Sequence, residues 1–385
     1  MPIETVQKIQ IPLNKPYVND SVLDYIKKVL DSGKLGGDGA MCKAVEQQIC
    51  QLFSVRHVLL TTSCTHALEM AMMMLYLQPG DEVITPSFTF VSTANAIIRA
   101  GGKPIFCDIE DLTCTIDITD FERKITKKTR AVIPVHYAGI SPDMDEINRI
   151  AAAHKIIVVE DAAQGVNAKY KGRYLGTIGD IGAYSFHDTK NYVSGEGGAF
   201  LTNNESLARR GEIIREKGTN RANFLRGEVD KYTWIDLGSS YVLSEILAAV
   251  LKHQLDELDL IQERRLRIHY FYVDGLKDLE RQEKLRLPII PEYSETNYHI
   301  FYILLPNEKE RNRVMKRMKE FGVGATFHYI PLHSSPYAQN VFGTKDLKLP
   351  VTDKISSTLL RLPIYPQLED GEIDYVIEKV RGILK

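Results

Sequence analysis

Short apolar runs alternate with helical patterns along the first part of the chain. The runs are HVLLTTS (57–63), DEVITPS (81–87), KPIFCDI (103–109), AVIPVHYAG (131–139) and KIIVVEDAAQG (155–165). Segments with apolar residues at helical spacing lie between several of them, for example THALEMAMMMLYL (65–77) and TANAIIRAG (93–101). This alternation predicts βαβ units and an α/β domain whose mostly parallel sheet is flanked by helices.

The pattern changes after about Gly238. Residues 244–276 read as one long amphipathic helix, and a strand (297–306), a helix (313–322), a strand (323–333) and a last helix (372–384) follow it. We therefore expect a large domain over residues 1–250, which begins with helical segments at 18–30 and 43–53. A smaller α+β domain is expected over residues 251–385.

Composition excludes several classes of protein. The 385 residues are 44% hydrophobic and 25% charged, with a net charge of −2, so a nucleic-acid partner is not expected. The N-terminus lacks the apolar segment of a signal peptide, and the apolar stretch 65–77 is interrupted by Glu69, so no membrane partner is expected either. The five cysteines are scattered without the spacing of a metal or iron–sulfur site, which is typical of reduced thiols in the cytoplasm.

Ligands of parallel sheets bind beyond the carboxyl ends of the strands, so the residues at those ends are the candidates for a binding site. The hydroxyl-rich segment Thr61, Thr62, Ser63, Cys64 and Thr65 precedes a predicted helix, where side-chain hydroxyls and free N–H groups suit an anion. Ordinary capping of the helix by Ser63 or Thr65 explains the same pattern. The chain has neither GxGxxG nor GxxxxGK[ST], so the usual nucleotide-binding loops are not indicated.

Three further residues follow predicted strands. Asp161 ends the run IIVVE, and it is either a helix N-cap or the partner of a ligand cation. Phe90 follows PSFT, and it is either a core aromatic or a planar face for a ligand ring. Lys190 is the one lysine of SFHDTKNYVSGEGGAF (185–200), and it is either a solvated lysine of a turn or a reactive amine.

These features together fit the needs of one cofactor. Pyridoxal 5′-phosphate (PLP) needs an anion site for its phosphate, a flat partner for its ring, an acid facing its pyridine nitrogen and a lysine for its aldehyde. Each feature is weak alone, but all of them are expected at the same edge of one sheet.

Several motifs resemble the DegT/DnrJ/EryC1/StrS family of sugar-nucleotide aminotransferases, which are fold-type I (aspartate aminotransferase-like) PLP-dependent enzymes. They are TTSCTHALEM, PSFTFVSTANA, VPVHYAG, VVEDAAQG, SFHDTKN with GEGG, and REKGTNR, and the resemblance covers nearly the whole chain. It implies that Lys190 binds PLP as a Schiff base, that Asp161 faces the pyridine nitrogen, that Gln164 reaches the ring hydroxyl and that Phe90 stacks on the ring.

The resemblance also implies a phosphate site. Thr65, the N–H of His66 and Ser185 would hold the phosphate within one subunit. Relatives commonly add an Asn from the neighbouring subunit; the best-aligned position here is Val242, so we expect Ser239 or Ser240 to replace that contact, or the contact to be absent.

The segments EIIREKGTNR, VDKYTW, DLGSSY and FHYIPLH are most similar to family members that make 4-amino-4,6-dideoxygalactose. The resemblance thus implies amination of a dTDP-4-keto-6-deoxyhexose by L-glutamate for surface polysaccharides such as enterobacterial common antigen or lipopolysaccharide. His328 and Tyr329 are expected near the sugar or diphosphate, although His328 also fits a structural histidine. Another 3- or 4-keto nucleotide sugar, or a non-catalytic regulator of the same fold, are the alternatives; Lys190 argues against the dehydratases of the group, which carry His there.

The family also implies a homodimer with shared active sites. The irregular basic segment 215–232 contains Arg215, Lys217, Arg221, Arg226 and Lys231. We expect it to be a loop, either a solvated one or one that reaches across the dimer so that Arg221 binds the substrate diphosphate.

Overall fold

The computed structural model describes residues 10–385, and a seven-stranded sheet forms its centre. The order of strands is β1-β9-β8-β5-β4-β2-β3. The bounds are β1 His57–Thr61, β2 Glu82–Pro86, β3 Lys103–Cys107, β4 Thr129–Val132, β5 Ile157–Asp161, β8 Ile181–Ser185 and β9 Gly198–Thr202. Of these seven strands, only β9 runs antiparallel to its neighbours, so the predicted, mostly parallel sheet is confirmed.

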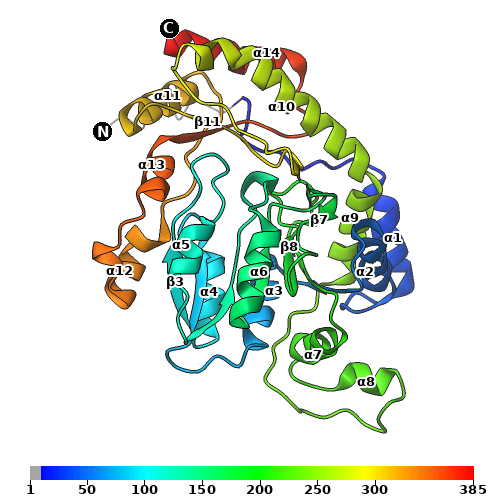
Figure 1. Ribbon diagram of the computed structural model, residues 1–385. Coiled ribbons are helices and arrows are strands. Elements are labelled where there is room, and N and C mark those ends of the chain that lie inside the picture. The colour runs from blue at the N-terminus through cyan, green and yellow to red at the C-terminus, as the bar shows by residue number, and fades with distance from the viewer. Residues whose placement is uncertain (1–9) are drawn as a thin grey trace, which may run out of the picture.

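Helices cover both faces of the sheet (Figure 1). Successive side chains of a strand point to opposite faces, so Val58 and Leu60 pack with the helices of one face and Leu59 with those of the other. The first face carries α2 Ala40–Phe53, α5 Ile118–Arg123, α6 Met144–His154 and α9 Glu245–Asp256; the second carries α3 Cys64–Met73, α4 Val91–Arg99 and α7 Glu205–Arg215. Burial on both faces explains why the strands are almost continuously apolar.

A second, smaller lobe follows, as expected. Its core joins α10 Leu258–Arg281, α11 Glu308–Glu320 and α14 Asp370–Leu384 to the antiparallel pair β11 Phe301–Leu304 and β12 Leu359–Leu362. Ile11, near the other end of the chain, also packs in this core, and it pairs with Val323. The domain boundary near residue 250 stays a prediction.

The remaining elements are short or peripheral. They are α1 Val22–Ser32, η1 Tyr137–Gly139, β6 Lys169–Tyr170, β7 Arg173–Tyr174, α8 Arg221–Leu225, β10 Ser294–Glu295, η2 Leu332–Ser334, α12 Pro336–Phe342, η3 Thr344–Asp346 and α13 Pro350–Thr358. No helix within residues 10–385 is long and apolar enough to cross a membrane.

Two predictions from periodicity are wrong. The single helix over 244–276 is two helices, α9 and α10, separated at Glu257. Because of this break, α9 packs on the central sheet while most of α10 packs in the core of the smaller lobe. The spacing of the apolar residues does not indicate the break. The strand predicted over 323–333 makes only isolated bridges, at Val323 and Thr326. This segment crosses between the lobes, where the N–H of Leu332 donates to Ser87 O.

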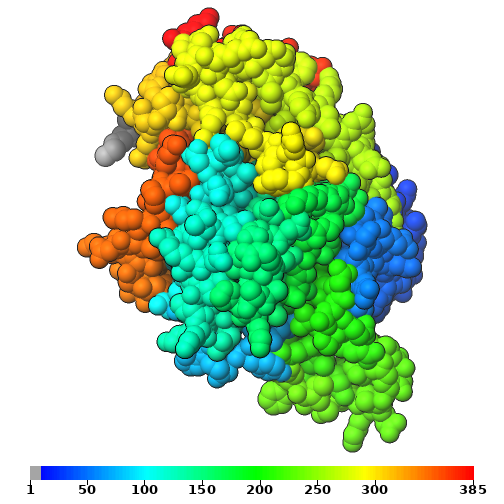
Figure 2. Space-filling view, viewed as in Figure 1, coloured from blue at the N-terminus to red at the C-terminus, as the bar shows by residue number. Residues whose placement is uncertain are grey.

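Only part of the basic segment 215–232 forms a projecting arm. α8 and the loop behind it extend away from the body of the molecule (Figures 1 and 2). Arg215 does not belong to this arm: it is 3% exposed at the end of α7 and pairs with Glu46 and Asp38. The expectation that it lies in a loop is wrong, because its buried guanidinium pairs with the carboxylates of Glu46 and Asp38.

Candidate active site

A cavity of 530 Å³ lies at the carboxyl edge of the sheet, between the two lobes. The large lobe lines it with residues at the ends of β1, β2, β5 and β8, while the smaller lobe contributes side chains from β12 and from the segments before β11 and after α11. β9 runs the opposite way, so its first residues lie at this edge too. Gly198 is needed there because a Cβ would lie 2.4 Å from the amide N of Cys64.

Lys190 lines this cavity from the loop after β8. Within residues 10–385, its amine has neither an ion pair nor a hydrogen bond. Burial lowers the pKa of Lys190, and the nearby Arg361 cation lowers it further, whereas Asp161 acts against this shift. An amine with a lowered pKa is a better nucleophile near neutral pH, so the solvated-lysine interpretation does not describe this site.

Asp161 is the last residue of β5 and is 5% exposed in the cavity wall. Its Oδ2 accepts a hydrogen bond of 2.7 Å from Thr93 Oγ1, and its Oδ1 accepts one from the N–H of Ala163 at 3.2 Å. No helix begins after Asp161, so it is not the N-cap that the sequence offered as an alternative. Both hydrogen bonds fix the orientation of the carboxylate, which can in turn accept a hydrogen bond from a cationic N–H.

The N-terminus of α3 forms one end of the cavity. Ser63 caps the helix: its Oγ accepts a hydrogen bond from the N–H of His66 at 3.1 Å. Ser63, Cys64 and Thr65 line the cavity, and Thr65 Oγ1 donates to Ser92 Oγ. Ser185, at the end of β8, lines the same space.

His66 is placed differently from the expectation. Its N–H already serves the cap, its Nδ1 bonds Thr62 Oγ1 at 2.5 Å, and its ring contacts Tyr241. It does not line the cavity. A phosphate contact from His66 would therefore have to displace Ser63 from the cap, whereas Thr65 and Ser185 already line the cavity, and Thr65 has only to turn its hydroxyl from Ser92.

An aromatic wall faces this end. Phe90 is 57% exposed at the start of α4, which excludes a core role, and its ring centroid lies 6.3 Å from that of Tyr329. Gln164 Nε2 donates to Tyr329 Oη at 3.0 Å, while Gln164 Oε1 accepts from the N–H of Ala138. Gln164 thus links the two lobes at the cavity wall as well as lining it.

Two histidines and an arginine of the smaller lobe complete the cavity. His328 Nδ1 hydrogen-bonds Tyr137 Oη at 3.2 Å, and His299 Nδ1 hydrogen-bonds Asn191 Oδ1 at 2.9 Å. Burial lowers the pKa of both histidines well below the usual range, so both are neutral. Arg361, on β12, lines the cavity beside them.

Sequence reasoning missed Thr93, His299 and Arg361. Thr93 lies in α4 about one helical turn after Phe90, so its spacing from Phe90 could have indicated it. Arg361 is a single cation inside the apolar run LLRLPIYP (359–366), which is the kind of signal that singled out Lys190. His299 lies in an apolar strand pattern and gives no such signal.

Ser240 and Arg221 do not line the cavity of their own subunit. Arg221 pairs with Glu216 on the projecting arm, and Ser240 lies exposed beside it, where it bridges Glu216. Val242 bridges Thr61. The roles expected for Arg221 and Ser240 thus depend on a second subunit.

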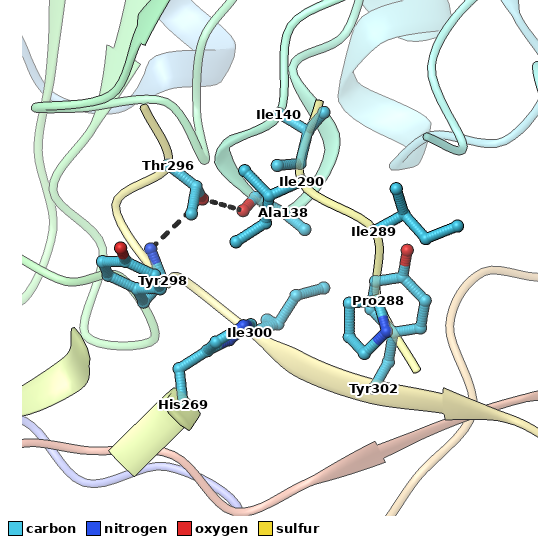
Figure 3. A pocket seen from close by; sticks show the side chains of 10 residues that line it. All are labelled: Ala138, Ile140, His269, Pro288, Ile289, Ile290, Thr296, Tyr298, Ile300 and Tyr302. Carbon is cyan, nitrogen blue, oxygen red and sulfur yellow. Dashed lines mark hydrogen bonds between the residues drawn. The ribbon is translucent and has the colours of Figure 1, made fainter. Parts of the chain in front are cut away.

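A smaller apolar cavity of 10 Å³ lies behind η1 (Figure 3). His269, Tyr298 and Ile300 line it from one side, and Thr296 closes it by donating to Ala138 O at 3.1 Å. It has space for at most about one water, and its lining contains no acidic or cationic side chain, so it is too small to be a substrate site.

The large cavity fits PLP. It is within the usual size range of ligand pockets and brings together an amine, a carboxylate, an exposed aromatic face and hydroxyls at a helix N-terminus. Lys190 would bind the aldehyde, Asp161 the pyridine N–H, and Thr65 and Ser185 the phosphate. Phe90 would cover one face of the ring.

Comparison with known proteins agrees with the assignment of PLP as the cofactor. Residues 16–381 match the model of the DegT/DnrJ/EryC1/StrS aminotransferase family. The spore coat polysaccharide biosynthesis protein SpsC of Bacillus subtilis (strain 168) is 35% identical over 383 residues, which cover 97% of each chain.

Solved structures of similar proteins share the fold. The aminotransferase TlmJ from Streptoalloteichus hindustanus has a TM-score of 0.90 at 28% identity, over 97% of this chain and 99% of TlmJ. The PLP-form of Spr1654 from Streptococcus pneumoniae has a TM-score of 0.89 at 25% identity, over 97% and 98% of the two chains. The chain therefore belongs to the DegT/DnrJ/EryC1/StrS family and is a PLP-dependent aminotransferase.

Proposed function

We propose that this aminotransferase transfers the amino group of L-glutamate to C4 of a dTDP-4-keto-6-deoxyhexose. The products would be 2-oxoglutarate and a dTDP-4-amino-4,6-dideoxyhexose, of galacto configuration, for a surface polysaccharide. The observation that carries the proposal is the presence of Lys190 and Asp161 in one cavity large enough for a sugar beside the cofactor. The relationship to SpsC, named for polysaccharide biosynthesis, supports a sugar as acceptor.

Different residues of the cavity would have different roles in this reaction. PLP supplies an aldehyde that exchanges amines and a ring that accepts electrons. Asp161, which accepts a hydrogen bond from Thr93, would hold the ring N–H. Lys190 would bind the cofactor between turnovers; as a free amine it would take the proton from the α-carbon of glutamate and, in the second half-reaction, deliver a proton to C4 of the sugar. Its lowered pKa suits both directions of transfer.

The functional unit in this proposal is a homodimer with shared sites. The projecting arm exposes large apolar side chains, among them Trp234 (76%), Leu237 (67%) and Leu225 (62%), which are costly to leave in water. Arg221 and Ser240 lie on or beside this arm, away from their own cavity. In a two-fold dimer the arm of one subunit would bring them to the cavity of the other, where Arg221 would bind the diphosphate and Ser240 the cofactor phosphate.

Product analysis tests the proposal. The enzyme is incubated with L-glutamate and a panel of dTDP- and UDP-linked 4-keto-6-deoxyhexoses, and aminated sugars are detected by mass spectrometry and assigned by NMR. We expect a dTDP-linked 4-amino product, and none with the Lys190→Ala protein. If glutamate converts the cofactor to its amine form but no sugar of the panel is aminated, the proposed acceptor is wrong.

A further inference from the structure

The two neighbours of Lys190 in the loop after β8 are held in different ways. Thr189 is exposed and hydrogen-bonds His187 of the same loop at 2.9 Å. Asn191 is 4% exposed, and its side chain bonds two residues of the smaller lobe. Within residues 10–385 the Lys190 amine makes no hydrogen bond of its own, so its position depends on how the loop is held.

Two hydrogen bonds tie Asn191 to the segment before β11. Asn191 Nδ2 donates to Asn297 O at 2.8 Å, and Asn191 Oδ1 lies 2.9 Å from His299 Nδ1. Because Nδ2 is the donor of this amide, Oδ1 is the acceptor, and the network assigns the proton to His299 Nδ1. His299 therefore donates to a residue of the other lobe that lies 108 positions earlier in the chain.

His299 is itself fixed by its backbone. Its N–H donates to Asn297 Oδ1 at 3.1 Å, and its carbonyl accepts from Arg265 Nη1 at 3.0 Å. Asn297 Nδ2 donates to the carbonyls of Gln164 and Val166, both at 2.8 Å, which fixes the segment on the loop after β5. His299 is thus a fixed donor, and Asn191 is the side chain that it orients.

His299 and Lys190 also face the same space. Both line the large cavity, and both line a polar cavity of 10 Å³ between the lysine loop and the smaller lobe. Burial lowers the pKa of His299 well below its usual range, and the charge of Lys190 lowers it further, so the ring is neutral. A neutral donor can orient the loop without adding a positive charge beside the lysine amine.

We infer that His299 is a positioning residue for Lys190: by hydrogen-bonding Asn191 it holds the lysine loop where the amine can bond the cofactor aldehyde. The inference rests on the role proposed for Lys190. In forming that bond the amine adds to the aldehyde carbon and water leaves, so the amine must reach a carbon whose place is set by the other contacts of the cofactor. Displacement of the loop should therefore weaken the covalent bond and leave the other contacts as they are.

The test compares two forms of the cofactor. PLP and pyridoxamine 5′-phosphate (PMP) share the ring and the phosphate, but PMP has an amine in place of the aldehyde and cannot bond Lys190. The full-length enzyme is loaded with each form, and equilibrium dialysis gives the two dissociation constants. His299→Phe should raise the dissociation constant of PLP about tenfold, the value of one buried hydrogen bond, and that of PMP less than about twofold.

Two amide variants identify the atom of His299 that acts. The amide nitrogen of His299→Asn lies at the place of Nδ1 and can still donate to Asn191, so the dissociation constant of PLP should stay within about threefold of the wild type. The amide of His299→Gln lies at the place of Nε2 instead, and this variant should lose as much PLP affinity as His299→Phe. The reverse order of the two amide variants would contradict the inference.

Asn191 provides an independent measurement. Asn191→Leu should reproduce the loss seen in His299→Phe, and the double variant should lose no more than Asn191→Leu alone, because both changes remove the same contact. His269→Phe is the matched control, since His269 is a buried histidine of the same lobe that does not line the large cavity. It should leave both dissociation constants as in the wild type. Thermal unfolding of each loaded variant checks the fold.

Three results would overturn the inference. They are an equal rise of both dissociation constants in His299→Phe, unchanged PLP binding in that variant, and losses that multiply to about 100-fold in the double variant. Lys190→Ala separates the inference from the proposed function, because it should weaken PLP binding relative to PMP binding. If Lys190→Ala keeps the wild-type ratio of the two constants, the role of Lys190 is refuted and that of His299 with it. If the ratio changes in Lys190→Ala but not in His299→Phe, only the role of His299 is refuted.

Discussion

Thr93 Oγ1 donates a hydrogen bond of 2.7 Å to Asp161 Oδ2, and both side chains are buried in the wall of the active-site cavity. Thr89 Oγ1 lies 2.9 Å from Thr93 Oγ1, so the hydroxyls continue from the end of β2 into α4. A hydrogen bond to a charged acceptor stabilises the ionised form, and Asp161 must be ionised to hold a protonated ring nitrogen. The helix that begins after Phe90 therefore also supplies the hydroxyl that holds Asp161 in the cavity wall.

This pair predicts a graded effect on turnover. Asp161→Asn should lower kcat at least about 100-fold, because an amide cannot hold the ring nitrogen protonated. Thr93→Val should lower it about tenfold, the value of one hydrogen bond to a charged group. Thr93→Ser keeps the hydroxyl and should stay near the wild type. Steady-state rates and cofactor affinity are measured together, and a Thr93→Val enzyme with unchanged kcat would show that Asp161 does not need its neighbour.

Lys190→Ala should abolish transamination while leaving the fold intact, since Lys190 is the amine that lines the cavity. The visible absorbance of lysine-bound PLP should be lost as well, and circular dichroism should be unchanged. Transamination at the parental rate would refute the role of Lys190.

Arg215 is expected to be essential for stability. Its guanidinium pairs with Glu46 at 2.7 Å and with Asp38 at 2.9 Å in the core. Arg215→Met leaves Glu46 and Asp38 with Lys43 as their remaining cationic partner. The free energy of unfolding should therefore fall by up to about 3 kcal/mol, the lower end of the cost of breaking a buried ion pair.

Lys217→Met is the control for Arg215. Lys217 lies two residues on, with its side chain 58% exposed and paired to Glu216. Such a surface pair contributes little, so urea unfolding should change by less than about 1 kcal/mol. Equal losses in the two variants would mean that burial of the Arg215 pairs is not the cause.

His269 predicts a pH dependence of stability. Burial beside the apolar cavity of Figure 3 lowers its pKa from 6.5 to about 4. Between these pH values His269 binds a proton in the unfolded chain but not in the folded protein. The free energy of unfolding therefore falls as pH drops from about 6.5 toward 4. His269→Phe should make the loss between pH 7 and pH 5 smaller by about 2 kcal/mol, measured by urea unfolding. His154→Gln, a change at an exposed histidine, is the control and is measured in the same way.

Subunit complementation tests the shared site. Lys190→Ala and Arg221→Ala chains are each expected to be inactive or severely impaired. If the arm serves the partner's cavity, a hybrid dimer has one site with both changes and one intact site. A random mixture should then regain about a quarter of wild-type activity, because half of the dimers are hybrids with half of their sites intact. No recovery, under conditions where a tagged chain demonstrates exchange, would place the action of Arg221 in its own subunit.

Much of the fold of the large lobe was predictable, because its strands and helices follow from the pattern of neighbouring residues in the sequence. The short β-branched runs must be buried on both faces, which makes them strands of a parallel sheet, and the residues that follow them must meet at one edge. That is why Asp161, Phe90, Thr65, Ser185 and Lys190 line one cavity as the sequence indicated.

Tertiary structure alone decided the rest, since it depends on contacts between distant segments. Thr93 meets Asp161 across 68 residues, and Arg361 reaches the cavity of Lys190 only because the smaller lobe folds over it. The same reason explains the two wrong predictions on Arg215 and on the helix over 244–276. Arg215 is buried because it pairs with carboxylates of residues far earlier in the chain. The helix breaks at Glu257 because its first half packs in the core of the large lobe and most of its second half packs in the core of the smaller lobe. Periodicity reports the face that a segment buries; it carries no information on which distant side chain will meet that face.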